Sequence, residues 1–152
     1  MSQFPIDALL EQICSAVRPG ETVLLQAPPG ADKTTRVPLA LIGALTEGQS
    51  VLEEHQKIWM IEPRRLATKA AAARLAASLG EDIGARIGYA VRGEQKRSGR
   101  TQVEVITDGL FLRRLQSDPS LAGVGCVIFD EFHERGRDAD LSLALLREAR
   151  PL

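Results

Sequence analysis

The chain of 152 residues has the length of one ordinary domain, and it can bury a core without disulfides or a structural metal. With 44% apolar and 26% charged residues it has the composition of a soluble globular protein, and its apolar runs are too short to span a bilayer, which excludes a membrane protein. The net charge of -1 excludes nucleic-acid binding through overall charge, and the absence of a secretory signal at the N-terminus favours the cytoplasm.

The first part of the chain alternates between helical and strand patterns. Apolar residues at helical spacing over 6–17 predict an amphipathic helix that ends before Pro19-Gly20. The short apolar run 22–26 predicts a strand that is buried on both faces. A loop of small residues follows it, and 33–45 has the pattern of a second helix.

The middle of the chain repeats this alternation. Residues 46–56 show weak periodicity and predict a surface connection, after which the apolar run 58–61 predicts a second buried strand. Residues 66–79 form an alanine-rich helical pattern, and Gly80 is suited to close it in a left-handed conformation. Small side chains on this helix allow it to pack closely on a sheet.

The last part of the chain has the same organisation. Three further strands are predicted at 86–91, 103–107 and 124–129, and two further helices at 110–116 and 139–150. This pattern predicts one α/β domain over 1–152, with a mostly parallel sheet and helices on both faces. Any ligand should then lie at the carboxyl ends of the strands.

Residues 92–100 are locally basic, with four cations against one acid. Such a segment can add to a phosphate-binding surface. No aromatic residue interleaves the charges to stack on bases, so we interpret it as a flexible, solvated loop. The two cysteines, Cys14 and Cys126, fall within apolar patterns and are expected to be buried as small hydrophobic side chains.

The loop after the first predicted strand is typical of triphosphate binding. A strand, a loop of small residues and a helix together supply converging backbone amides, a phosphate-binding cation at Lys33 and a magnesium-ligand hydroxyl at Thr34. The segment assigned to the nucleotide is Ala27, Pro28, Pro29, Gly30, Ala31, Asp32, Lys33, Thr34 and Thr35.

Two carboxylates directly follow the last predicted strand, at the same edge of the sheet as this loop. Asp130 is assigned to Mg²⁺, and Glu131 to the metal site and to the water that attacks the γ-phosphate. An isolated Asp-Glu pair is more often a helix cap followed by a first-turn acid. The order of the loop and the Asp-Glu-Phe-His segment favours a nucleoside-triphosphate site.

With these residues in order, the chain resembles the DEAH-box helicases of superfamily 2, and among them the bacterial HrpB-type proteins. The matching segments are Phe4-Pro5-Ile6, Gln26-Ala27-Pro28-Pro29-Gly30, Glu62-Pro63-Arg64-Arg65-Leu66-Ala67, Gly88-Tyr89, Thr107-Asp108-Gly109-Leu110 and Asp130-Glu131-Phe132-His133-Glu134-Arg135. The resemblance covers nearly the whole chain and implies the first RecA-like domain of such a helicase.

The resemblance also implies an activity and its site residues. It implies ATP hydrolysis with Mg²⁺, coupled to binding and unwinding of single-stranded RNA or DNA. The implied catalytic residues are Glu131, Lys33 and His133, of which His133 would link the nucleotide state to nucleic-acid binding. The implied nucleic-acid contacts are Arg64, Arg65, Thr107, Asp108 and Gly109.

The sequence departs from this family in two places. Asp32 stands where the phosphate loop has glycine, so we expect weakened ATP binding. The chain also ends before the strand with the Ser-Ala-Thr motif and before the second RecA-like domain, so we expect a sheet without that strand and a truncated domain that is inactive alone.

Two alternatives to an active helicase domain remain at this stage. One is a remnant or nucleic-acid-binding module without hydrolysis, which Asp32 favours. The other is a different phosphate-loop enzyme such as a small-molecule kinase, and the adjacent Glu131 and His133 argue against it because a kinase does not require them.

Overall fold

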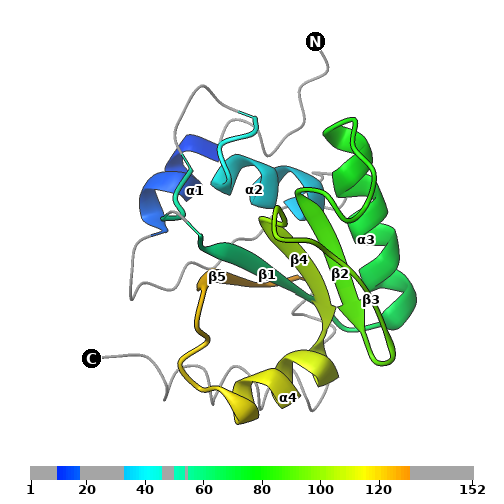
Figure 1. Ribbon diagram of the computed structural model, residues 1–152. Coiled ribbons are helices and arrows are strands. Elements are labelled where there is room, and N and C mark those ends of the chain that lie inside the picture. Colours follow the sequence, from blue (N-terminus) through cyan, green and yellow to red (C-terminus); the bar gives the residue numbers. More distant parts are fainter. Residues whose placement is uncertain (1–9, 18–32, 46–49, 54, 131–152) are drawn as a thin grey trace.

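The computed structural model describes residues 10–17, 33–45, 50–53 and 55–130, and within them five strands form one mixed sheet in the order β3-β2-β4-β1-β5 (Figure 1). The strands are β1 (Lys57–Glu62), β2 (Ile87–Val91), β3 (Glu94–Lys96), β4 (Val103–Thr107) and β5 (Val124–Phe129). The helices are α1 (Leu10–Ala16), α2 (Lys33–Leu41), α3 (Arg65–Ser78) and α4 (Asp108–Ser117). Neighbouring strands are parallel, except that β3 runs antiparallel to β2.

The sheet has apolar side chains on both faces, as its unbroken apolar strands predict. On one face, alternate residues of β1 and β4 pack with α1, α2 and α3, and these include Ile58, Met60, Val103 and Val105. On the other face the intervening residues, which include Trp59, Ile61 and Ile106, pack with Phe111 and Leu115 of α4. Figure 1 shows α3 and α4 on opposite sides of the sheet. The predicted α/β architecture is therefore confirmed.

Two helix ends depend on glycine. Gly80 closes α3 at φ +67°, with its N–H bonded to the Ala77 carbonyl and the next N–H bonded to the Ala76 carbonyl, as predicted. Gly43 closes α2 in the same way at φ +80°, so α2 ends at Leu41 and the predicted end at residue 45 is wrong. The helical periodicity of the sequence continues past this glycine, and the backbone does not.

The strands predicted at 58–61, 86–91, 103–107 and 124–129 are confirmed, with shifts of one residue at some ends. The predicted strand 22–26, the predicted helix 139–150 and the first residues of the predicted helix 6–17 lie outside the described residues. The helix predicted at 110–116 begins two residues earlier, at Asp108.

Strand β3 is a feature that the sequence prediction missed. Residues Arg92 and Gly93 form a two-residue turn with Gly93 at φ +80°, and β3 then pairs with β2 from Val91↔Glu94 onwards. The flexible loop predicted over 92–100 is therefore wrong for its first half. All three residues of β3 are polar and partly or fully exposed, so this edge strand leaves no apolar alternation in the sequence.

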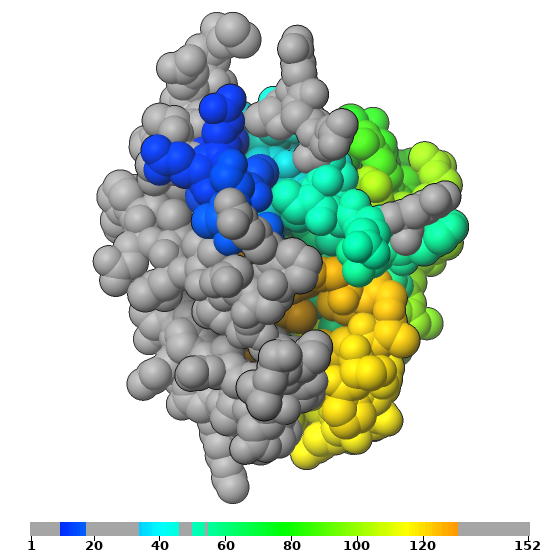
Figure 2. All heavy atoms as spheres, turned by 90° about the vertical axis from the view of Figure 1, so that its left-hand side faces the viewer, coloured from blue at the N-terminus to red at the C-terminus, as the bar shows by residue number. Residues whose placement is uncertain are grey.

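Strand β5 packs beneath the segment that leads into β1. On the face shown in Figure 2, the orange residues of β5 lie directly below the teal residues of that segment. A Cβ atom at Gly125 would lie 2.5 Å from Gln56 Oε1 and 2.9 Å from Leu52 Cδ2. The absence of a side chain at Gly125 therefore allows this close approach. No described helix is long and apolar enough to cross a membrane.

The two cysteines are free and partly buried. Burial raises the pKa of the Cys126 thiol from its ordinary value near 9 to about 11. Because the unfolded chain releases this proton more readily, the free energy of unfolding should fall by about 2 kcal/mol between pH 9 and pH 11 through Cys126. Urea unfolding across this pH range should show a smaller loss of unfolding free energy for the Cys126→Ala variant than for the parent chain. Equal losses in both chains would contradict a buried thiol.

Candidate functional site

A hydrogen bond joins the start of α2 to the end of β5. The Thr34 hydroxyl, in the first turn of α2, donates to Asp130 Oδ2 at 2.9 Å, across 96 positions of sequence. The Asp130 N–H donates to the Ile61 carbonyl at 3.1 Å, which holds the end of β5 against β1. A hydroxyl and a carboxylate are oxygen ligands of the kind that Mg²⁺ prefers. These two residues therefore fit a magnesium site.

The other residues assigned to the nucleotide are placed unequally. Lys33 is the first residue of α2, at the helix terminus that favours anions. Thr35 is buried, with 5% of its surface exposed, so it contributes to packing at the start of α2. Residues 27–32, Glu131 and His133 lie outside the described residues.

Three neighbouring strands bring the predicted site residues to one edge of the sheet. Glu62 at the end of β1 is in register with Thr107 at the end of β4. Strand β5, which Asp130 follows, lies on the other side of β1. Since all three strands are parallel, the segments after them share the carboxyl edge. Among the residues that the structure describes, Thr107 and Asp130 therefore follow strands that end at the same edge.

The arginines predicted to contact nucleic acid lie at the start of α3, and both are exposed. Arg65 Nη1 donates to the Arg92 carbonyl at 2.8 Å, and its guanidinium lies 3.5 Å from Glu94. Lys69 forms a second ion pair with Glu94 at 2.9 Å, and its hydrogen bond lowers the pKa of Glu94. The start of α3 is thus attached to the turn between β2 and β3.

Thr107, Asp108 and Gly109 form the junction between β4 and α4. Thr107 is the extended residue that precedes the helix, at φ -74° and ψ 154°. The Gly109 N–H donates to Asp108 Oδ1 at 2.8 Å, which fixes the first turn of the helix. All three residues are partly buried. Hydroxyl and amide groups at a helix start are suited to contact a phosphate.

Inside β4 the structure shows a fully buried carboxylate that the sequence prediction missed. Glu104 lies in the middle of β4 with no exposed surface. A charged residue within Val103–Ile106, an otherwise apolar run, was the signal that could have revealed it, because a buried carboxylate requires partners.

The sheet and the residues along its carboxyl edge define a RecA-like helicase domain. Residues 8–147 match the DEAD/DEAH box helicase family, and the chain belongs to that family.

Comparison with individual proteins shows which members of this family the chain resembles. The chain is 44% identical over 146 residues to the ATP-dependent RNA helicase HrpB of Escherichia coli strain K12, covering 96% of this chain and 17% of that protein. It is 34% identical over 149 residues to the DExH-box ATP-dependent RNA helicase DExH1 of Arabidopsis thaliana, covering 98% and 15%. The crystal structure of Escherichia coli DEAH/RHA helicase HrpB matches with a TM-score of 0.87 and 42% identity, covering 96% and 18%. The chain spans about a sixth of the length of these relatives.

Proposed function

We propose that the chain is the ATP-binding domain of an ATP-dependent RNA helicase, in which ATP hydrolysis responds to single-stranded nucleic acid, and that the chain alone has little of this activity. The hydrogen bond between Thr34 and Asp130 carries this proposal, because it brings a phosphate-loop hydroxyl and a strand-end carboxylate to one point. The similar proteins are RNA helicases by name, which supports RNA over DNA as the partner.

Each site residue has a proposed role in hydrolysis. Thr34 and Asp130 would hold Mg²⁺, which when bound neutralises charge on the triphosphate. Lys33 would contact the phosphates from the start of α2, and Glu131 would accept a proton from the attacking water. The water oxygen forms a bond to the γ-phosphorus as the bond to the leaving ADP oxygen breaks.

The nucleic-acid contacts are proposed for the rest of the carboxyl edge. Arg64 and Arg65 would contact phosphates from the start of α3, and Thr107 to Gly109 from the start of α4. His133 would link this edge to the nucleotide. Unwinding is proposed to require a second RecA-like domain as a partner, since two domains must move against each other to displace a strand.

The experiment that tests hydrolysis is a comparison of the chain with its Glu131→Gln variant. We expect RNA-stimulated release of phosphate from ATP by the chain to be weak, and to fall by about a hundredfold or more in the variant, because general-base catalysis typically contributes at least this factor. The measurement is phosphate release with and without single-stranded RNA. Equal turnover by both chains would contradict the assigned role of Glu131.

A second candidate function is a nucleic-acid-binding module without hydrolysis. Asp32 favours it, because this residue replaces the glycine that precedes the phosphate-loop lysine. In the same assay, RNA binding without any ATP turnover would support this candidate over the first.

A further inference from the structure

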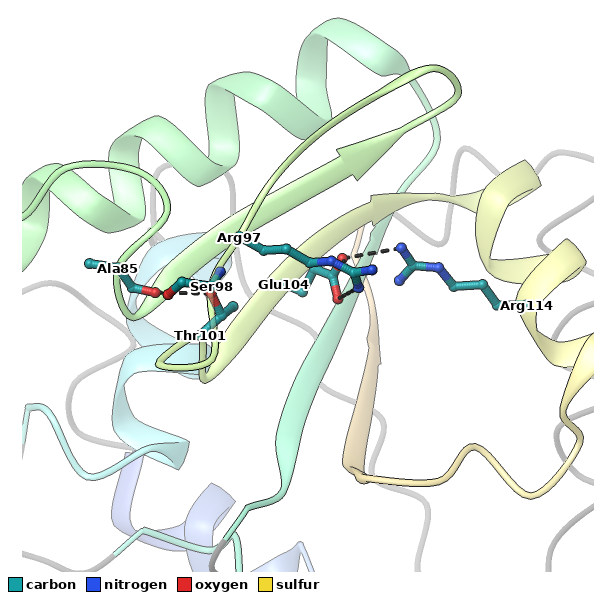
Figure 3. A network of polar contacts seen from close by, with 6 residues as sticks. All are labelled: Ala85, Arg97, Ser98, Thr101, Glu104 and Arg114. Atoms are coloured by element: carbon teal, nitrogen blue, oxygen red, sulfur yellow. Dashed lines mark hydrogen bonds and ion pairs between the residues drawn. The ribbon is translucent and has the colours of Figure 1, made fainter.

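An ion cluster around the buried carboxylate of Glu104 lies between the β2–β3 hairpin and α4, with the Arg97 side chain 37% exposed. Arg97, which follows β3, places Nη1 at 3.2 and 3.3 Å from the two carboxylate oxygens of Glu104. Arg114 of α4 places Nη2 at 3.2 Å from Glu104 Oε2. Figure 3 shows both arginine side chains reaching the Glu104 carboxylate, Arg97 from the end of the hairpin and Arg114 from α4. One residue of β4 thus bonds to both neighbouring elements.

A glycine in the neighbouring strand allows Arg97 to reach Glu104. Gly88 of β2 lies beside Glu104 of β4 in the sheet register. A Cβ atom at Gly88 would lie 3.0 Å from the Arg97 Cβ and 2.6 Å from the Lys96 carbonyl oxygen. The missing side chain therefore leaves the space through which Arg97 crosses β2.

The segment after Arg97 is also fixed. The Ser98 N–H donates to the Thr101 hydroxyl at 3.0 Å, and this hydroxyl donates to the Ala85 carbonyl at 2.9 Å (Figure 3). Thr101 is buried, with 7% of its surface exposed. Arg97 is thereby held over the sheet by a closed turn.

The partner on α4 is constrained as well. The Arg114 guanidinium lies 5.0 Å from the centre of the Trp59 ring, and its side chain is 19% exposed. Trp59 is beside Glu104 in the sheet register, on the face that α4 covers. Arg114 therefore fixes α4 against the same row of residues that Arg97 reaches from the hairpin.

Both elements joined by Glu104 adjoin residues of the proposed nucleic-acid edge. Helix α4 begins directly after Thr107, and the turn of the hairpin accepts the hydrogen bond from Arg65. A buried carboxylate between two guanidiniums adds little net stability, but it requires a defined geometry of every partner. Such a carboxylate can therefore fix the position of one element relative to another.

We propose that Glu104 is a positioning residue, which sets the hairpin and α4 at the spacing that a nucleic-acid strand requires. This inference rests on the proposed nucleic-acid binding. Glu104 itself does not contact the nucleic acid, because its side chain has no exposed surface. Its loss should therefore weaken binding of single-stranded RNA and leave nucleotide affinity unchanged.

The first test is the Glu104→Gln variant, because the positioning role and the change in charge predict opposite effects on RNA affinity. Removing a negative charge near a phosphate-binding edge should leave RNA affinity unchanged or raise it. We expect instead an increase in Kd of about tenfold for a single-stranded RNA, measured by fluorescence anisotropy. The matched control is Glu81→Gln, which breaks the Glu81–Arg86 ion pair beyond the other end of α3 and should not weaken binding.

A second pair of variants keeps the inference testable if Glu104→Gln does not fold. Arg97→Gln and Lys96→Gln each remove one cation from the same hairpin, and of these two only Arg97 contacts Glu104. We expect Arg97→Gln to raise the Kd for RNA at least about threefold more than Lys96→Gln does. Equal effects, or a folded Glu104→Gln with parental RNA affinity, would overturn the inference.

The same assay separates this inference from the proposed function. If the unsubstituted chain does not bind single-stranded RNA, the proposed nucleic-acid function fails and the inference fails with it. If the unsubstituted chain binds and the Glu104 and Arg97 variants bind like their controls, only the positioning role fails. A nucleotide Kd that rises in parallel with the RNA Kd would indicate general disruption and would also overturn the role.

Discussion

Replacement of Asp32 by glycine is expected to tighten ATP binding by about tenfold to a thousandfold. Asp32 stands at the position of a phosphate-loop glycine in the sequence, so we expect its side chain and negative charge to oppose the approach of the phosphates to the backbone. One like-charge contact at about 4 Å costs roughly 1 kcal/mol in water and about 4 kcal/mol at a surface-like dielectric, and each 1.4 kcal/mol is about tenfold in affinity. Calorimetric titration of ATP with Mg²⁺ would measure the change.

The Asp32→Asn variant serves as the matched control, since it removes the charge and keeps the size of the side chain. We expect it to recover part of the affinity, and the remainder to depend on the freedom of the glycine backbone. Equal affinities for the parent chain and Asp32→Gly would show that Asp32 does not impair the loop. That result would also remove the argument for a chain without hydrolysis.

Gly88→Ala is expected to destabilise the fold by about 3 kcal/mol, at the upper end of typical overpacking costs. Its Cβ would lie 2.6 Å from the Lys96 carbonyl oxygen, which is backbone and cannot rotate away. The two strands would have to separate, and the path of Arg97 to Glu104 would be disturbed. Urea unfolding, followed by circular dichroism, would measure the loss.

Gly99→Ala is the control for the same chemical change. An added Cβ at Gly99 meets nothing within 4 Å, so this variant should be neutral or slightly more stable, by up to about 1 kcal/mol. If Gly88→Ala unfolded at the same urea concentration as Gly99→Ala, the close approach of β3 to β2 would not constrain the fold. The contrast therefore tests the contact that an added Cβ would make at Gly88.

The site could be predicted from the sequence as far as local patterns and chain order determine it. Continuous apolar runs separated by helical patterns predict parallel strands, and parallel strands bring their following segments to one edge. Thr34 and Asp130 were assigned to one metal on this argument, and they lie in hydrogen-bond contact. Their roles in catalysis, with those of Lys33, Glu131 and His133, stay predictions.

Only the tertiary structure decided two features that the apolar pattern of the sequence does not mark. These are strand β3 and the partners of Glu104. Strand β3 has no apolar side chain to reveal it, because an edge strand of three residues can face solvent. The interactions of Glu104 depend on how Arg97 crosses Gly88 and on the rotation of α4 against Trp59. Sequence spacing specifies neither, because both follow from the packing of elements against one another. The sequence by itself thus determined which segments follow the parallel strands at the carboxyl edge of the sheet. The packing of elements determined which charged side chains contact Glu104.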